Sequence, residues 1–364
     1  MRNKEDFYVD IKKRALAIYE QYQFIMKEIS KNETNICKYK LNFHLEEDLS
    51  LGGKAWSEEF TDNIIINKGV IDNFFDYFYS ITKMRSDLLI KQLHLKNEEV
   101  TDDLSYEMVK FDDNGKANVF DSKVIDIKLA GLLTIFVSRF IITHELGHLL
   151  NGHCEFLNSK DKNSIQFISM FEKNNNKKSR SISPLDLRTL EMDADAFAAT
   201  DNFRNLILLY DLFEERIDSD LNIKPIELFY WWSFAIRSNF LITQRILKDE
   251  EYEVDKTHLP SVARWILIIG SILDSIENDI YKINYRDGDS KEKLLQSLMS
   301  GFSYAEKCYN ESFYTNYNCI EETINSEDYK QFVTSTQKNW EKLRNELDIF
   351  SRLPLFINNV HKYG

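Results

Sequence analysis

Glycine and proline are both scarce in this sequence. Its 364 residues include 11 glycines and 4 prolines, where average usage would give about 25 and 18. Propellers, β-sandwiches and glycine-rich nucleotide-binding repeats need more tight turns than this allows. Hydrophobic residues make up 43% of the chain and aromatic residues 13%, which is typical of a folded protein. The composition therefore predicts a folded, mostly helical chain.

Positive charge is also in short supply. The chain has 46 Lys and Arg residues against 59 Asp and Glu residues, and its formal net charge is -13. The electrostatic field of such a chain repels phosphate groups, which excludes a broad nucleic-acid-binding surface. The longest basic cluster, around 177–180, lies among Asn and Ser residues and is interpreted as a solvated loop. We therefore expect no nucleic-acid partner.

Paired cysteines and long apolar runs are missing as well. The four cysteines are scattered, without C-x-x-C spacing, and the first residues lack the apolar core of a signal peptide. The most apolar stretches are 129–137, 229–236 and 265–273, each well short of the roughly 20 residues that span a bilayer. These features predict a cytoplasmic protein without a membrane partner.

Local patterns indicate where helices and strands begin and end. Apolar residues three and four apart predict a helix over 6–29, and the β-branched run 63–67 predicts a strand that leads directly into another helix. Gly152 is expected to end a long apolar helix. Ser183 and Pro184 are expected to cap and begin a later one.

Three of the seven histidines fall within ten residues, and two of them form the motif H-E-x-x-H with His144, Glu145 and His148. Residues four apart lie on one helix face, about 5 to 6 Å apart at Cβ, so both imidazoles can reach one Zn²⁺. Glu145 lies on the same rim, where it can take a proton from the attacking water. The motif predicts a site for one Zn²⁺ per chain.

A catalytic zinc site needs a third protein ligand and an open position. Glu191 is the favoured candidate, because Glu191 and Asp195 lie four residues apart in an E-x-x-A-D sequence and share one face of a predicted helix. Asp195 would then accept the free N–H of a ligand imidazole. Without H-E-x-x-H, the same pair would be interpreted as a solvated acidic face. Asp193 is expected to face away from the pair into solvent.

His153 is a second candidate ligand. It lies nine residues after His144, on the opposite face of a helix that continues, although Gly152 could turn the chain back. The spacing of a three-histidine site is not met, because Asn151 and Cys154 occupy the places of its glycine and its last histidine. We therefore interpret His153 as a pocket or regulatory residue.

H-E-x-x-H on one helix with E-x-x-A-D on a later helix resembles the gluzincin zinc metallopeptidases. The chain is most similar to the family of the CAAX-processing and heat-shock membrane proteases, and to its soluble relatives, such as the Lit-type peptidases of phage exclusion. Segments 64–71 and 257–264 look like the family's edge strand with its following helix and its later T-H-P…R segment, although Leu259 interrupts the His-Pro pair. The resemblance implies an α+β, predominantly helical fold, with a zincin-like core, a small sheet and additional helices.

This interpretation divides the chain into three parts. Residues 1–50 form an N-terminal helical segment. Residues 51–217 form the zincin-like catalytic core, with a mobile polar loop at 158–183. Residues 218–364 form a C-terminal helical region that packs on the core.

The expected function is zinc-dependent hydrolysis of peptide bonds in a cytoplasmic protein, in phage exclusion or a stress response. Glu145 would be the general base. His258 is the candidate hydrogen-bond donor to the oxyanion. The alternative is that His258 has no catalytic role and only stands at the start of a helix. The strand residues Ile64, Ile65 and Ile66 would bind an extended substrate by strand addition. The polar loop suggests that the peptidase is inactive until a partner or a signal activates it.

The sequence is also compatible with two other functions. A repressor-cleaving stress-regulator protease also uses H-E-x-x-H, but such proteases usually carry a DNA-binding domain, and no helix-turn-helix segment is found here. The other is a non-catalytic interaction protein with a structural metal site. Zinc analysis of the native protein and of a Glu145→Ala variant separates these functions.

Overall fold

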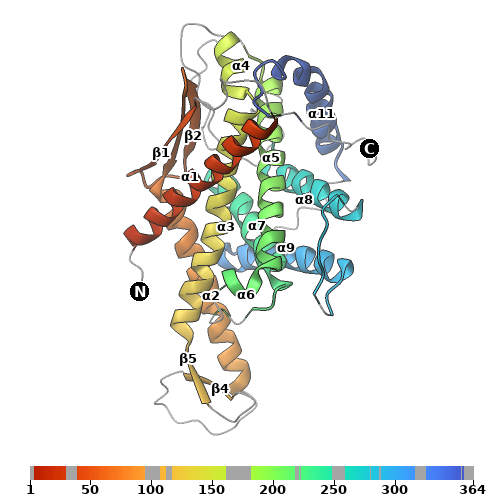
Figure 1. Cartoon of the computed structure of the whole chain (residues 1–364). Helices are drawn as coiled ribbons and strands as arrows, with labels where there is room; N and C mark the ends of the chain where they lie inside the picture. Colours follow the sequence, from red (N-terminus) through yellow and green to blue (C-terminus); the bar gives the residue numbers. More distant parts are fainter. Residues whose placement is uncertain are drawn as a thin grey trace.

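The chain is predominantly helical and carries a small mixed sheet, which confirms the α+β class (Figure 1). The computed structural model describes residues 4–29, 39–94, 107–111, 117–160, 182–217, 221, 223–247, 259–278, 280–286, 288–315, 325–353 and 355. The helices are α1 (Lys4–Ile29), α2 (Lys68–His94), α3 (Ser122–Leu150), α4 (His153–Lys160), α5 (Pro184–Asp211), α6 (Phe213–Arg216), α7 (Glu227–Leu247), α8 (Ser261–Glu277), α9 (Lys291–Phe313) and α11 (Glu327–Leu347). The strands are β1 (Lys40–Glu46), β2 (Gly53–Glu58), β3 (Thr61–Asn67), β4 (Glu107–Phe111) and β5 (Ala117–Asp121).

The three-stranded sheet has the order β1-β3-β2. Strand β1 runs parallel to β3 and β2 runs antiparallel to it. The run Ile64, Ile65 and Ile66 therefore lies in the central strand, with a neighbour on each side. Both edges of β3 are already hydrogen-bonded, so the prediction that these residues bind a substrate by strand addition is wrong.

Strand β1 lies within the part of the chain that was expected to be an N-terminal helical segment. Its sequence alternates polar and apolar residues, and of its side chains Phe43 is buried against the core. Helix α1 precedes it, as the apolar spacing predicts. Because β1 pairs with β3 along its whole length, the first 50 residues contribute directly to the sheet of the expected core.

Helices α3 and α5 run side by side through the middle of the molecule, and the sheet lies beside α3 (Figure 1). One continuous cluster of buried side chains joins α1, the sheet, α3, α5, α7 and α9. Within α3, the segment 127–150 is long and apolar enough to cross a membrane by length and composition alone. However, 67% of its most apolar window is buried inside the protein, as in the core helix of a folded domain.

The ends of the helices follow the local signals. Ser183 Oγ accepts a hydrogen bond from the backbone N–H of Asp186 at 3.1 Å, and Pro184 is the first residue of α5. Gly152 has a φ of 79°, a backbone conformation that favours glycine, and it separates α3 from α4. Residues 158–160 belong to α4 rather than to the expected loop, whose residues 161–181 lie outside the described part of the chain.

A segment near residue 350 ties the sheet to α4. The guanidinium of Arg352 forms ion pairs with Asp62 of β3 and Glu155 of α4, and it lies 3.7 Å from the ring centroid of Tyr39. Asp62 is fully buried and also accepts hydrogen bonds from the hydroxyls of Tyr19 and Ser57. This network holds four separate parts of the chain together beside the end of α3.

Candidate metal centre

The close approach of α3 and α5 brings the predicted ligands together. A β-carbon at Gly147 would lie 3.2 Å from Cα of Ala194. Only a residue without a side chain fits there without displacement of α5. The turn of α3 that carries His144 and His148 therefore faces the turn of α5 that carries Glu191.

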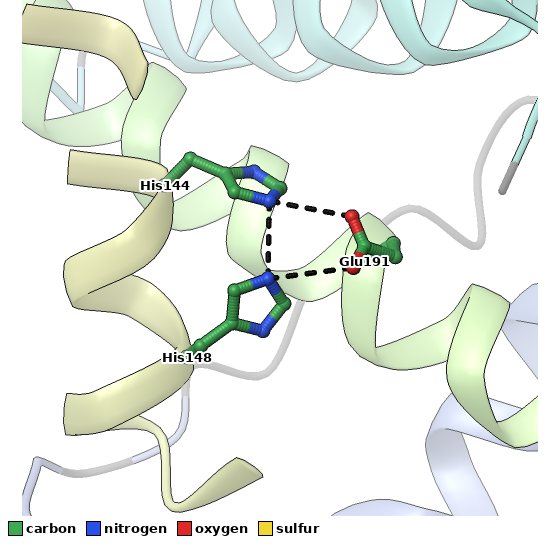
Figure 2. A group of neighbouring side chains, drawn as sticks. All are labelled: His144, His148 and Glu191. Atoms are coloured by element: carbon green, nitrogen blue, oxygen red, sulfur yellow. Dashed lines mark hydrogen bonds and ion pairs between the residues drawn. The ribbon is translucent and has the colours of Figure 1, made fainter. Parts of the chain in front are cut away.

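The side chains of His144, His148 and Glu191, here called the metal group, converge on one point between the two helices, the metal position (Figure 2). The two Nε2 atoms lie 3.0 Å apart. Glu191 Oε2 lies 3.3 Å from His144 Nε2, and Glu191 Oε1 lies 3.5 Å from His148 Nε2. The histidines are fully buried, and Glu191 is 4% exposed.

These distances fit a zinc ion. Four ligand atoms arranged as a tetrahedron about 2.1 Å from zinc lie about 3.4 Å from one another. The two Nε2 atoms are 3.0 Å apart, and each has a Glu191 oxygen nearby, Oε2 at 3.3 Å from His144 and Oε1 at 3.5 Å from His148. Neutral imidazole nitrogens and a carboxylate are also ligands that zinc prefers. The chemistry and the spacing of the group are therefore suited to hold a metal ion.

His144 is held on its other side by Asp195. Its Nδ1 lies 2.9 Å from Asp195 Oδ1, and Arg264 donates two hydrogen bonds to the same carboxylate at 2.6 and 2.7 Å. Burial by itself would raise the pKa of Asp195, but the charge and hydrogen bonds of Arg264, followed by those of His144, lower it to about 2. The ionised carboxylate accepts the Nδ1–H of His144, which leaves its Nε2 facing Glu191.

The same surroundings make His144 basic while no metal is bound. Burial by itself would lower the pKa of this imidazole, but hydrogen bonds to Asp195 and Glu191, with the charges of both carboxylates, raise it to about 9. A metal ion that binds here must displace that proton, because only the deprotonated nitrogen is a ligand.

Glu145 is fully buried on α3, next to His144. Gly53, the first residue of β2, lies directly against it. A β-carbon at Gly53 would lie 3.1 Å from Glu145 Oε1. The start of β2 therefore forms one wall of the space that the Glu145 carboxylate occupies.

His153 does not lie on the far side of a continued helix. The reversal at Gly152 brings its Nδ1 to 2.9 Å from His148 Nδ1, and its Nε2 lies 3.0 Å from Asp193 Oδ2. Asn151 Nδ2 donates to the same Asp193 oxygen at 2.6 Å. Asp193 is only 8% exposed, so the expectation that it points into solvent is wrong.

The remaining predicted residues have different outcomes. His258 lies outside the described residues, and Ile64, Ile65 and Ile66 belong to the central strand and not to the metal group. Arg264, the last residue of the segment that resembles the family's T-H-P…R pattern, is buried and bound to Asp195. No local pattern could reveal that contact, because the two residues are 69 positions apart.

No protein-family model, curated protein or solved structure matches the chain. The fold and the site define a predominantly helical α+β protein with a buried His-His-Glu group spaced for a metal ion.

Proposed function

We propose that this protein is a zinc-dependent endopeptidase, a gluzincin, that holds one Zn²⁺ with His144, His148 and Glu191. The convergence of these three side chains is the observation that carries the proposal. Glu145 lies one residue from a ligand on the same helix, as H-E-x-x-H peptidases require.

The number of ligands favours a catalytic site over a structural one. Structural zinc sites are usually closed by four protein ligands, whereas catalytic sites use three and keep one position open. The described residues supply three ligand atoms within 4.8 Å of one another. His153 lies behind His148 and contacts its Nδ1, so it does not take the fourth position.

In the proposed reaction, a zinc ion in this site would supply Lewis-acid activation of water and of the scissile carbonyl. Glu145 takes up the proton of the attacking water and passes it to the leaving amine. Asp195 and Arg264 hold His144 in the tautomer that leaves Nε2 free for the metal. The buried surroundings strengthen each of these interactions.

For the substrate, the strand to consider is β2, because it lies at the edge of the sheet and begins beside Glu145. Asn67 N donates a hydrogen bond to Gly52 O, so residues 52 and 67 form a hydrogen-bonded pair at the start of the antiparallel ladder between β2 and β3. Hydrogen-bonded and non-hydrogen-bonded pairs alternate along such a ladder. The backbone groups of Gly53 and Ala55 therefore point away from β3. Cys154 Sγ lies 3.8 Å from the carbonyl oxygen of Ala55, so a peptide would add at the Gly53 end.

Zinc analysis together with a Glu145→Gln variant tests the proposal. We expect about one zinc per chain in both the native protein and the variant, with hydrolysis of a peptide library lost only in the variant. Glu20→Gln, at an exposed position of α1, is the matched control and should keep both properties. Native protein without zinc would refute the proposal. Zinc without Glu145-dependent hydrolysis would indicate a structural metal site in an interaction protein.

The resemblance to Lit-type peptidases favours a cytoplasmic protein as the substrate, and a role in phage exclusion or a stress response. Comparison of protein termini in cells that express the native chain or Glu145→Gln would identify that substrate. New termini that appear equally with both chains would contradict the role.

A further inference from the structure

The two predicted histidine ligands are each supported on the side that faces away from the metal position. His144 Nδ1 contacts Asp195, whereas His148 Nδ1 contacts a second histidine, His153, at 2.9 Å. The Nε2 atom of His153 in turn lies 3.0 Å from Asp193 Oδ2. His148 and His153 are fully buried, so no bulk water competes for these contacts.

We propose that His153 and Asp193 are positioning residues that fix the ring orientation and the tautomer of His148, as Asp195 does for His144. This inference rests on the metal site of the proposed function, but it does not depend on peptide hydrolysis.

The hydrogen bonds allow one proton arrangement for neutral imidazoles. Asp193 Oδ2 accepts a hydrogen bond from the side-chain amide of Asn151 at 2.6 Å. An ionised carboxylate can only accept hydrogen bonds, so Nε2 of His153 must carry the proton in its contact with Asp193. A neutral His153 then has a bare Nδ1 that accepts a hydrogen bond. His148 must therefore donate from Nδ1, which leaves the lone pair of its Nε2 directed at the metal position.

The chain reversal at Gly152 makes this arrangement possible. Gly152 ends α3 with a φ of 79°, and His153 begins α4 directly after it. Asp193 lies two residues from Glu191, away from the helix face that Glu191 shares with Asp195. The reversal at Gly152 brings His153 around the end of α3 into contact with Asp193. Helix α5 therefore supplies the proposed ligand Glu191 and two supporting carboxylates, Asp195 for His144 and Asp193 for His153.

Partners of this kind affect metal affinity. Loss of a residue that orients a metal ligand typically weakens metal binding 10- to 100-fold. His153→Phe keeps a ring of similar size but removes the acceptor. His153→Asn can place an amide oxygen close to the position of the imidazole Nδ1, so it should restore part of the interaction with His148.

The test measures the dissociation constant of Zn²⁺ for the full chain by competition with a chromophoric chelator. We expect His153→Phe to weaken binding about 10- to 100-fold, and His153→Asn to weaken it less. Asp193→Asn should also weaken binding, because the amide no longer fixes the proton on His153 Nε2. His44→Asn, at an exposed position of β1, is the control and should leave the affinity unchanged.

A second readout separates positioning from general destabilisation. In the Co²⁺-substituted protein, the visible d–d spectrum should change in His153→Phe and revert toward the native spectrum in His153→Asn. A folded His153→Phe with native zinc affinity would overturn the inference. If His153→Phe does not fold, native affinity in Asp193→Asn and His153→Asn would overturn it. Native protein that binds zinc but cleaves no peptide would refute the peptidase alone, since the affinity comparison would still decide this inference.

Discussion

Gly147 and Ala194 face each other at the point where α3 and α5 lie closest to the metal group. Gly147 lies within the turn that joins His144 to His148, and Ala194 lies within the turn that joins Glu191 to Asp195. A β-carbon at Gly147 would lie 3.2 Å from Ala194 Cα. The separation of the two helices at this contact therefore sets the distance from the histidine pair to Glu191.

Two glycines of α3, Gly147 and Gly131, should respond in opposite ways to substitution by alanine. Gly147→Ala should lower the free energy of unfolding by about 1 to 3 kcal/mol, because an extra methyl group overpacks the helix contact. It should also weaken zinc binding, since α5 must move away. Gly131→Ala is the matched control, because a β-carbon there meets no atom within 4 Å, and it should stabilise the protein by up to about 1 kcal/mol. Denaturant unfolding and zinc titration measure both variants, and equal effects would contradict the prediction.

Removal of the proposed zinc ion should destabilise the folded chain. If His144, His148 and Glu191 bind one zinc ion, as proposed, the ion should stabilise the folded chain by about 2.7 kcal/mol at a free concentration 100 times the Kd. Thermal unfolding with and without a chelator measures the effect. His144→Ala should abolish the zinc-dependent rise in Tm, whereas His44→Ala should retain it. A zinc-dependent rise that persists in His144→Ala would place the metal elsewhere.

A substitution at Gly53 should affect the proposed general base Glu145 without affecting the proposed metal ligands. Gly53→Val should displace the Glu145 carboxylate, because even a β-carbon at this position lies 3.1 Å from Oε1. We expect kcat/KM for peptide hydrolysis to fall about tenfold or more, since misplacement of a catalytic group by about 1 Å can cost 100-fold. Zinc affinity should stay within about twofold of the native value, because no ligand moves. Loss of zinc with loss of activity would show that β2 supports the ligands instead.

The buried ion pair between Asp195 and Arg264, behind His144, should matter more for stability than an exposed ion pair. Arg264→Met leaves the Asp195 carboxylate buried without the guanidinium that lowers its pKa. Removal of one partner of a buried pair typically costs about 3 to 5 kcal/mol, and we expect a loss near the lower end because His144 still contacts Asp195. Lys330→Met breaks an exposed pair with Glu327 and should change the free energy of unfolding by less than about 1 kcal/mol. Urea unfolding compares the two, and a similar small change in both would contradict the prediction.

Much of the metal group could be predicted from the sequence, because helical spacing alone puts His144 and His148 on one face and Glu191 with Asp195 on another. The sequence could not show how α4 folds back. Asp193 lies away from Glu191 on an isolated helix, and only the reversal at Gly152 brings His153 to it.

The sheet was predicted in part. The β-branched run ending at Asn67 predicted β3 and the helix that follows it. The alternation of polar and apolar residues over 40–46 is a strand signal, yet the interpretation places these residues in a helical segment. The edge position expected for 64–66 rests on the family resemblance alone, and the pairing with β1 overturns it. Parallel pairing of β1 with β3 joins residues 21 positions apart, and no local pattern specifies such a partner.

The ion pair between Asp62 and Arg352 has a consequence for the order in which the protein folds. These residues are 290 positions apart, so a growing chain makes the sheet long before it makes the cation. Until residue 352 has left the ribosome, the Asp62 carboxylate has the hydroxyls of Tyr19 and Ser57 as partners but lacks this positive charge. A buried carboxylate without its cation is costly, and contacts between distant residues form slowly. The sheet beside α3 therefore reaches its full stability only after residue 352 has been synthesised.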